Sequence, residues 1–322
     1  MSSRISAVVI GRNEGARLIA CLDSLVASDI DQIVYVDSGS DDGSQDAARA
    51  RGAQVVLLDT TLPFTAARAR NAGFAEVMQT HPAPDYVQFI DGDCILDTDW
   101  IATARAFLEA HEDVAVVCGR RRERFPEASV YNRLIDQEWD TPVGEARACG
   151  GDALMRSAAL AAAGGYNPGL IAGEEPELCV RLRQAHWRIW RLDAEMTLHD
   201  AALTRLSQWW RRARRAGHAY AEGAALHGAP PERHYVPQRR RALLWGAVLP
   251  LATVVAGLFV SGWLAGLLLM LWPLQILRGW RKHRDLAAAL AMTFCKLPEA
   301  QGVFTYFWRR LTRAEAQLIE YK

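Results

Sequence analysis

Short apolar runs alternate with amphipathic segments through the first two hundred residues of the chain. Short continuous apolar runs are typical of buried strands, and apolar residues at helical spacing fill the segments between them. The strands expected from this pattern are 5–10, 32–37, 55–58, 86–90 and 114–118. The expected helices are 15–27, 45–51, 65–79, 98–110, 153–163 and 177–185. The alternation predicts βαβ units, and therefore an α/β fold with a mostly parallel sheet and flanking helices.

The pattern changes after residue 202. Residues 203–225 predict a helix rich in Arg and Trp, and the 36 residues 242–277 carry no charged side chain. A single helix of that length would span about 54 Å, whereas the hydrocarbon core of a bilayer is about 30 Å thick. We therefore expect a break at Ser261-Gly262. The two resulting helices would cross a membrane, enter it as a re-entrant hairpin, or pack inside a soluble protein. Residues 286–308 predict interfacial helices.

The charges divide the chain in the same way. Residues 1–202 hold 19 Lys and Arg against 31 Asp and Glu, a net −12, whereas 203–241 hold 9 against 2, a net +7. An acidic main domain argues against a nucleic-acid-binding protein, and basic residues on both sides of the apolar stretch favour a membrane with both ends in the cytoplasm. We expect a catalytic domain at 1–202, a basic surface helix and linker at 203–241, an apolar hairpin at 242–278, and interfacial helices at 279–322.

The cysteines and the N-terminus favour a cytoplasmic position for the main domain. Six cysteines are spread widely, without a CxxC pair, which fits neither a zinc site nor a disulfide framework. They are Cys21, Cys94, Cys118, Cys149, Cys179 and Cys295. The N-terminal apolar run, Ile5–Ile10, is shorter than the core of a signal peptide. We expect reduced thiols.

Acidic residues follow two of the predicted strands. Asp91 and Asp93 come directly after strand 86–90 in the sequence DGD, and Asp37 ends strand 32–37. Ligands of such sheets bind at the carboxyl ends of the strands, where two carboxylates can hold a divalent cation through oxygen. A DGD sequence is also common in simple turns. Arg70, in the sequence ARNAG before the DGD strand, adds a guanidinium suited to a phosphate or a base carbonyl.

The order of these motifs resembles a known family. AVVIGRNE, VDSGSDDGS, ARNAG and FIDGD follow one another as in the inverting glycosyltransferases of family 2, which have the GT-A fold. GGDALMR and AGGYN resemble the acceptor-side segment of that family, and GEEPELCVRL resembles its catalytic-base segment. The resemblance spans residues 5–200. It implies transfer of a sugar from a UDP-, GDP- or TDP-sugar donor to a lipid-linked or polysaccharide hydroxyl, at the cytoplasmic face of a bacterial inner membrane.

The resemblance also implies roles for individual residues. The donor-binding residues would be Asn13, Asp37, Arg70 and Asp91. Mg²⁺ or Mn²⁺ would be held by Asp93, Asp91 and His199. The acceptor-side residues would be Gly151, Asp152, Trp209 and Trp210. The two tryptophans match loosely, and a membrane-surface helix with Trp at the interface explains them equally well. Arg120–Arg124 would line an acceptor channel or face solvent.

The catalytic-base segment departs from the family pattern. The family has Glu-Asp, with Asp as the base, whereas this chain has Glu174-Glu175. A carboxylate ionised at neutral pH can accept the proton of an acceptor hydroxyl. We therefore expect Glu175 to be the base, with Glu174 as the second choice. The departure also keeps open a non-catalytic scaffold subunit of a membrane polysaccharide assembly. A processive polysaccharide synthase is a further alternative, against which the small number of apolar segments argues.

Overall fold

The computed structural model describes residues 3–312, and the chain divides into two compact units. The first comprises residues 1–126 and 135–202, and the second comprises 127–134 and 203–322. The second unit therefore begins close to the boundary expected at residue 203. The sequence did not indicate that residues 127–134 belong to it.

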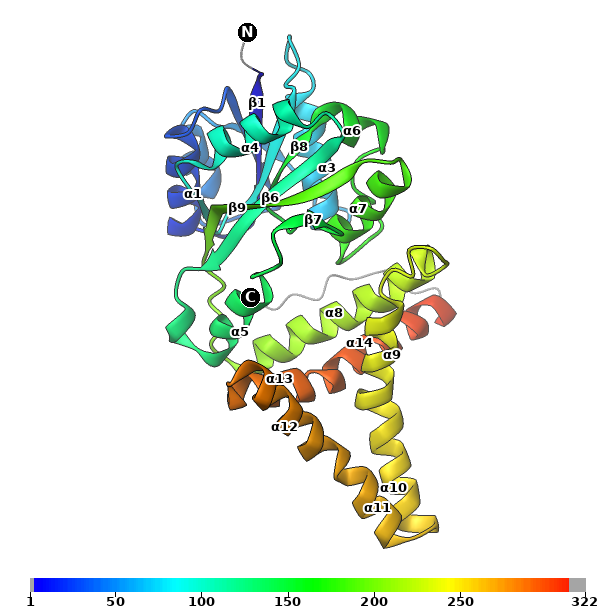
Figure 1. The fold of residues 1–322 in the computed structure, drawn as a ribbon. Coiled ribbons are helices and arrows are strands. Elements are labelled where there is room, and N and C mark those ends of the chain that lie inside the picture. Colours follow the sequence, from blue (N-terminus) through cyan, green and yellow to red (C-terminus); the bar gives the residue numbers. More distant parts are fainter. Residues whose placement is uncertain (1–2, 313–322) are drawn as a thin grey trace. The chain divides into compact units, whose positions relative to one another are not determined.

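A nine-stranded sheet forms the centre of the first unit (Figure 1). Its order is β3-β2-β1-β4-β8-β6-β9-β5, and β7 pairs with β9. Five strands correspond to the expected ones: β1 (Ile5–Gly11), β2 (Gln32–Asp37), β3 (Gln54–Leu57), β4 (Tyr86–Asp91) and β6 (Val114–Glu123). Four were not expected: β5 (Cys94–Leu96), β7 (Gly144–Ala146), β8 (Ala153–Arg156) and β9 (Arg188–His199). The α/β fold is confirmed.

The sheet is mixed, whereas the sequence predicted a mostly parallel one. β1 to β4 pair in parallel, but β8 runs antiparallel to both β4 and β6, and β5 and β7 run antiparallel to β9. The predicted helix 153–163 is wrong in its first part, because residues 153–156 form β8 and only Ser157–Ala162 form helix α6. Ala, Leu and Met favour helices, but pairing in the centre of the sheet overrides this preference.

Helices pack against this sheet, and some of them carry residues of the candidate site. The main ones are α1 (Ala16–Val26), α2 (Ser44–Arg49), α3 (Ala66–Val77), α4 (Trp100–Ala110) and α7 (Glu174–Gln184). Helix α3 lies directly on β1, since a Cβ on Gly73 would stand 2.3 Å from Val8 Cγ1. This close approach brings Arg70, one turn earlier on α3, to the carboxyl end of β4.

The second unit is helical. It contains the start of α5 (Val130–Glu138), and then α8 (Leu206–His227), α9 (Val236–Leu243), α10 (Leu249–Phe259), α11 (Gly262–Leu269), α12 (Leu271–His283), α13 (Leu286–Phe294) and α14 (Lys296–Thr312). Helices α8 and α14 pack closely, because a Cβ on Gly302 would stand 2.0 Å from the carbonyl oxygen of Arg214.

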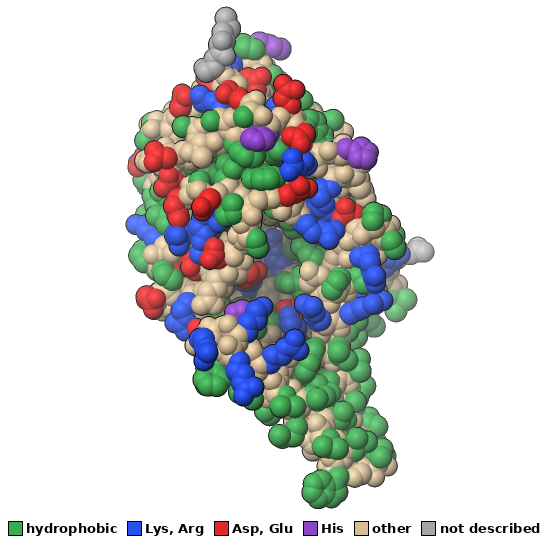
Figure 2. All heavy atoms as spheres, in the orientation of Figure 1, with side chains coloured by type: hydrophobic (Ala, Val, Ile, Leu, Met, Phe, Trp, Pro, Cys, Tyr) green, Lys and Arg blue, Asp and Glu red, His purple; other side chains and the backbone are tan. Residues whose placement is uncertain are grey.

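Two continuous helical segments of the second unit, 236–259 and 262–283, are long and apolar enough to cross a membrane. They break at Val260-Ser261, where Ser261 Oγ accepts a hydrogen bond from the Trp263 amide. Hydrophobic side chains cover the end formed by α10 and α11 (Figure 2), and Trp263 is 88% exposed. Length, composition and exposure together support association with a membrane.

Candidate active site

Arg70 lies among three carboxylates at the carboxyl end of β4. Its Nη2 donates to Asp91 Oδ1 at 2.9 Å, and its Nη1 lies 2.9 Å from Oε1 of both Glu174 and Glu175. Burial lowers the pKa of the guanidinium, but the three carboxylates outweigh burial and hold this pKa above its usual value. Arg70 therefore stays charged and ties β4 to α7. Its predicted contact with a nucleotide base stays a prediction, and both terminal nitrogens are already engaged by carboxylates.

Glu174 and Glu175 open helix α7 after Gly173, whose φ of 80° is left-handed. The Glu174 side chain is 3% exposed and that of Glu175 is 15% exposed. Burial raises the pKa of Glu175 to about 7; the charge of Glu174 adds to this rise and Arg70 opposes it. Glu175 thus has the more open carboxylate and a pKa close to neutral. These are the properties of a general base.

Gly151 leaves the space between these groups open. A Cβ at this position would stand 2.8 Å from Arg70 Nη2, 2.9 Å from Asp91 Oδ2 and 3.3 Å from Glu175 Oε1. The sequence predicted an acceptor-side position for Gly151, and the glycine lies next to the candidate base. Its contact with an acceptor stays a prediction.

Asp152 lies beside Asp91 and Arg121 in the interior of the first unit. Its side chain is fully buried, with Oδ1 accepting from the Asp91 amide at 3.1 Å and Oδ2 from Thr197 Oγ1 at 2.8 Å. Arg121 Nη1 lies 3.2 Å from the same Oδ2, and Arg121 Nη2 lies 3.3 Å from Asp91 Oδ2. The buried Asp152 carboxylate thus contacts Asp91 and Arg121, and its acceptor-side role stays a prediction.

Asp93 and His199 lie side by side at the ends of neighbouring elements. Asp93 Oδ2 lies 3.3 Å from His199 Nε2, and both side chains are buried. On the other side of the imidazole, Nδ1 lies 3.3 Å from Oε2 of Glu123, whose side chain is fully buried. Burial, and then the charge of Arg121, lower the pKa of His199. The lowered pKa favours the neutral imidazole. With its proton on Nδ1 the ring would donate to Glu123 and leave Nε2, beside Asp93, for a cation.

This arrangement fits a divalent cation. Two ligand atoms of an octahedral ion lie about 3 Å apart when each is about 2.1 Å from the metal. A carboxylate oriented behind the imidazole is also the usual support of a histidine ligand. Cys94 lies close enough to Asp93 and His199 to complete a group of three. Burial raises the pKa of its thiol well above the usual value. Mg²⁺ and Mn²⁺ also prefer oxygen ligands to sulfur, so Asp93 and His199 are the better candidates.

Asp37 and Asn13 build the loops that follow β2 and β1. Asp37 is 1% exposed; its Oδ1 accepts from the Tyr35 hydroxyl, and its Oδ2 accepts from the Gly39 and Ser40 amides and from Gln45. Burial raises the pKa of Asp37, but these hydrogen bonds outweigh burial and lower it. Asn13 joins the two loops by accepting from the Asp41 amide. Asp37 is thus engaged by its own loop, and its contact with a donor stays a prediction, as does that of Asn13.

Trp209 and Trp210 belong to α8 in the second unit. The Trp209 ring lies 6.0 Å from the ring of Tyr131, and Trp210 Nε1 donates to Gln301 Oε1 at 2.9 Å. Both contacts are made inside the second unit. The acceptor-side role that the sequence predicted for these residues stays a prediction.

Glu123 and Trp139 were not identified as site residues from the sequence, and Arg121 was singled out only within the run Arg120–Arg124, which was expected to line an acceptor channel or face solvent. Arg121 stands 4.6 Å over the Trp139 ring, and the same ring meets His199 edge-on at 4.8 Å. The expected strand ended at residue 118, whereas β6 continues to Glu123. A strand extended through RRRE would have placed Arg121 and Glu123 on the same face, because alternate residues share a face.

Part of the chain matches a known protein family. Residues 6–160 match the model of the family described as "Glycosyl transferase family 2". The succinoglycan biosynthesis protein ExoA of Rhizobium meliloti (strain 1021) is 26% identical to this chain. The match covers 97% of this chain and 96% of the relative.

Solved structures agree on the fold. The mannosyltransferase PcManGT from Pyrobaculum calidifontis, in complex with GDP-Man and Mn²⁺, has a TM-score of 0.67 and 20% identity, over 96% of this chain and 88% of its own. The glucosyl-3-phosphoglycerate synthase from Mycobacterium tuberculosis, with Mn²⁺, UDP and glucosyl-3-phosphoglycerate, has a TM-score of 0.50 and 19% identity, over 71% and 81%. At these identities the likeness establishes the fold.

The first unit is a GT-A domain with a cluster of carboxylates at the carboxyl end of its central strands. Residues 6–160 match glycosyltransferase family 2, and this match together with the relative indicates that the protein is a glycosyltransferase.

Proposed function

We propose that the protein is an inverting, metal-dependent glycosyltransferase in which Glu175 is the general base. The observation that carries this proposal is the Glu175 carboxylate, which has a pKa raised to about 7 and lies beside the Arg70–Asp91 pair. A base is most effective when its pKa lies near the working pH. Glu175 accepts the proton of the acceptor hydroxyl while the hydroxyl oxygen forms a bond to the anomeric carbon. The bond from this carbon to the diphosphate oxygen breaks, and the nucleoside diphosphate leaves.

The other residues of the cluster orient these groups. Arg70 fixes the direction of Glu175 through their ion pair, and Asp152 fixes Asp91 through the backbone amide of that residue. Asp91 faces the donor, and Gly151 keeps the space between Asp91 and Glu175 clear for the reacting atoms. Positioning of this kind matters because a misplacement of about 1 Å can cost about a hundredfold in rate.

Asp93 and His199 would hold the divalent ion, with Asp91 reaching it or the ribose. The charge of the site supports a cation: five carboxylates (Asp91, Asp93, Asp152, Glu174 and Glu175) face two guanidinium groups (Arg70 and Arg121). A bound Mn²⁺ or Mg²⁺ would stabilise the negative charge that develops on the departing diphosphate. Because Mg²⁺ prefers ligand sets made of oxygen, the imidazole of His199 favours Mn²⁺.

The acceptor we propose is a lipid-linked or polysaccharide hydroxyl at the cytoplasmic face of the bacterial inner membrane. Two helical segments long enough to cross a membrane support a membrane location, with Arg239–Arg241 and Arg278–Arg284 at their outer ends. Basic residues at both ends favour a cytoplasmic position for the catalytic unit. The relative named for succinoglycan biosynthesis supports a polysaccharide pathway.

A donor screen tests this proposal. The detergent-purified full chain is incubated with UDP-, GDP- and TDP-sugars, Mn²⁺ or Mg²⁺, and membrane extract as the acceptor source, and release of the nucleoside diphosphate is followed. We expect turnover of one donor by the wild type and none by Asp93→Ala. Donor binding without turnover by the wild type would contradict an enzyme of this kind and favour the scaffold subunit. A labelled product that elongates without release from the enzyme would favour the processive synthase.

A further inference from the structure

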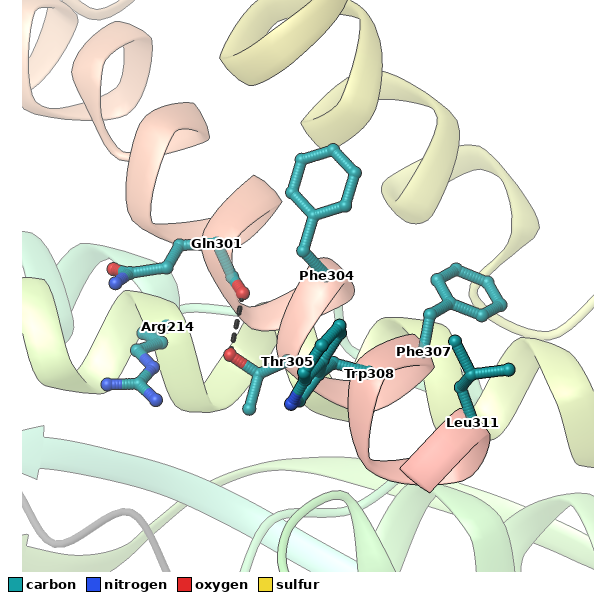
Figure 3. A pocket seen from close by; sticks show the side chains of 7 residues that line it. All are labelled: Arg214, Gln301, Phe304, Thr305, Phe307, Trp308 and Leu311. Carbon is teal, nitrogen blue, oxygen red and sulfur yellow. Dashed lines mark hydrogen bonds between the residues drawn. The ribbon is translucent and has the colours of Figure 1, made fainter. Parts of the chain in front are cut away.

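The second unit carries a groove that is lined by residues of α8 and α14. Its volume is about 680 Å³, and its lining residues are Arg214, Gln301, Phe304, Thr305, Phe307, Trp308 and Leu311. Figure 3 shows Arg214 and Gln301 together at one end, and Phe307 and Leu311 at the opposite end. The groove therefore has a polar end and an apolar end.

The apolar end is open to its surroundings. Phe304 is 54% exposed, Trp308 is 65% exposed and Leu311 is 79% exposed. All three lie on α14, with Phe307 on the same helix. Exposed aromatic and aliphatic side chains gathered in one place mark a surface that contacts apolar material. The unit also contains the two segments suited to a membrane, so the nearest apolar material is lipid.

The polar end carries one guanidinium group, that of Arg214. The Arg214 side chain makes no hydrogen bond or ion pair with residues 3–312, although its Nε is buried. Burial lowers the pKa of the neighbouring Arg309, and the charge of Arg214 lowers it further, while Glu222 opposes both effects. The same two arginines add to the effect of burial on His218, whose pKa is lowered to about 4. A partly buried guanidinium without a counter-ion costs free energy, which an anion would recover.

Gln301 is oriented to assist in binding an anion. Its Oε1 accepts a hydrogen bond from Trp210 Nε1 at 2.9 Å, so its amide nitrogen is the end left to donate. This contact also gives Trp210 a definite place at the polar end of the groove. Thr305 Oγ1 donates to the backbone carbonyl oxygen of Gln301 at 2.8 Å, one turn earlier on α14 (Figure 3).

We propose that this groove binds an anionic membrane phospholipid, with the phosphate at Arg214 and Gln301 and an acyl chain along Phe304, Phe307 and Leu311. A phosphate suits the bidentate geometry of a guanidinium group. Aromatic side chains at the level of the headgroups, together with arginine, are typical of the membrane interface. This proposal concerns the second unit alone and does not depend on the transfer chemistry.

Native mass spectrometry of the delipidated full chain in a neutral detergent tests the proposal. The probes are phosphatidylglycerol, diacylglycerol with the same acyl chains, and inorganic phosphate. We expect wild type to retain phosphatidylglycerol at least tenfold better than the other two. Arg214→Gln should lower phosphatidylglycerol affinity about tenfold, since a charge-assisted hydrogen bond is lost. Arg211→Gln, on the exposed side of the same helix, is the matched control and should bind as wild type does.

Several outcomes would overturn the proposal. Equal retention of diacylglycerol would mean a purely apolar groove, and equal binding of inorganic phosphate would mean a free-phosphate site. Equal losses of phosphatidylglycerol affinity in Arg214→Gln and Arg211→Gln would mean that positive charge in general attracts the lipid, without a specific role for Arg214. No retention by the wild type would mean that another occupant, such as a protein segment or a second copy of the chain, covers the groove. If Arg214→Gln does not fold, Gln301→Ala at an exposed position replaces it, with loss of phosphatidylglycerol expected and wild-type retention contradicting the proposal.

Discussion

Arg70 and Glu175 form an ion pair of 2.9 Å, and the same guanidinium nitrogen of Arg70 also lies 2.9 Å from Glu174. Two consecutive carboxylates thus share one cationic nitrogen, while the second terminal nitrogen of Arg70 binds Asp91. One guanidinium group faces three carboxylates, so its single charge does not neutralise each of them fully. The pKa of Glu175 therefore rises to about 7 because of burial and the charge of Glu174, in spite of the contact with Arg70. Glu174 and Glu175 consequently have different roles.

Glu174→Gln should shift the pH profile of the enzyme. Activity requires Glu175 without its proton, so kcat/KM should rise with pH and level off above about 7 in the wild type. The charge of Glu174 raises the pKa of Glu175, and a neutral Gln removes that contribution. The acid limb of the kcat/KM profile should therefore move to lower pH in Glu174→Gln. A limb that stays in place or moves upward would argue against coupling of the two carboxylates.

Glu123→Gln should weaken metal binding. In our proposal Glu123 does not bind the metal itself. Instead, it orients the imidazole of His199 through Nδ1. Loss of such a supporting carboxylate typically costs about 10- to 100-fold in metal affinity. Titration calorimetry with Mn²⁺ measures the change. Cys94→Ser serves as the control, because Mn²⁺ prefers oxygen ligands to sulfur. A larger loss of affinity in Cys94→Ser than in Glu123→Gln would contradict this assignment.

Gly151→Ala should lower the activity of the enzyme, with a smaller effect on its stability. The new Cβ would stand within 3.0 Å of Arg70 Nη2 and Asp91 Oδ2, so the ion pair between them must shift. A displacement of about 1 Å at reacting groups can cost about a hundredfold in kcat/KM. Gly150→Ala is the matched control, because nothing lies within 4 Å of a Cβ there. Equal activities of the two variants would show that the space beside Gly151 does not matter.

Arg70→Met should destabilise the first unit strongly. Removing the guanidinium leaves Asp91, Glu174 and Glu175 close together without their shared cation. Breaking a buried ion pair on one side typically costs about 3–5 kcal/mol. Arg105→Met is the comparison, since Arg105 pairs with the 82% exposed Asp29 and such surface pairs contribute about 0–1 kcal/mol. Both are followed by denaturant unfolding of the first unit, and similar shifts in the two variants would contradict a central role for Arg70.

The parts of the fold with a strong local pattern could be predicted from the sequence. β1, β2 and β4 are mostly apolar runs, and the ends of β2 and β4 locate Asp37 and Asp91 correctly. β8 was missed because its Ala, Leu and Met residues have helical preferences, and its strand conformation depends on pairing with β4 and β6. β9 was missed because Arg, Asp and Glu interrupt its apolar residues.

The contacts of the site depend on long-range packing in the same way. The sequence identified Asp93 and His199, and the structure brings them within 3.3 Å of each other. It did not identify Glu123, and it did not predict that Arg121 lies near His199. Both residues lie on the continuation of β6 and come near His199 only through the pairing of β6 with β9. The burial of Asp152 likewise follows from the position of β8 inside the sheet.

Glu175→Gln is the decisive variant for the assignment of Glu175 as the base. Turnover and donor binding are measured separately on the full chain, with the donor found in the screen and saturating Mn²⁺. We expect kcat to fall by about 10²- to 10⁴-fold, because a general base is lost, while the Kd of the donor changes less than about threefold. Glu174→Gln under the same conditions should keep a larger kcat. A Glu175→Gln variant that turns over at the wild-type rate would contradict the assignment.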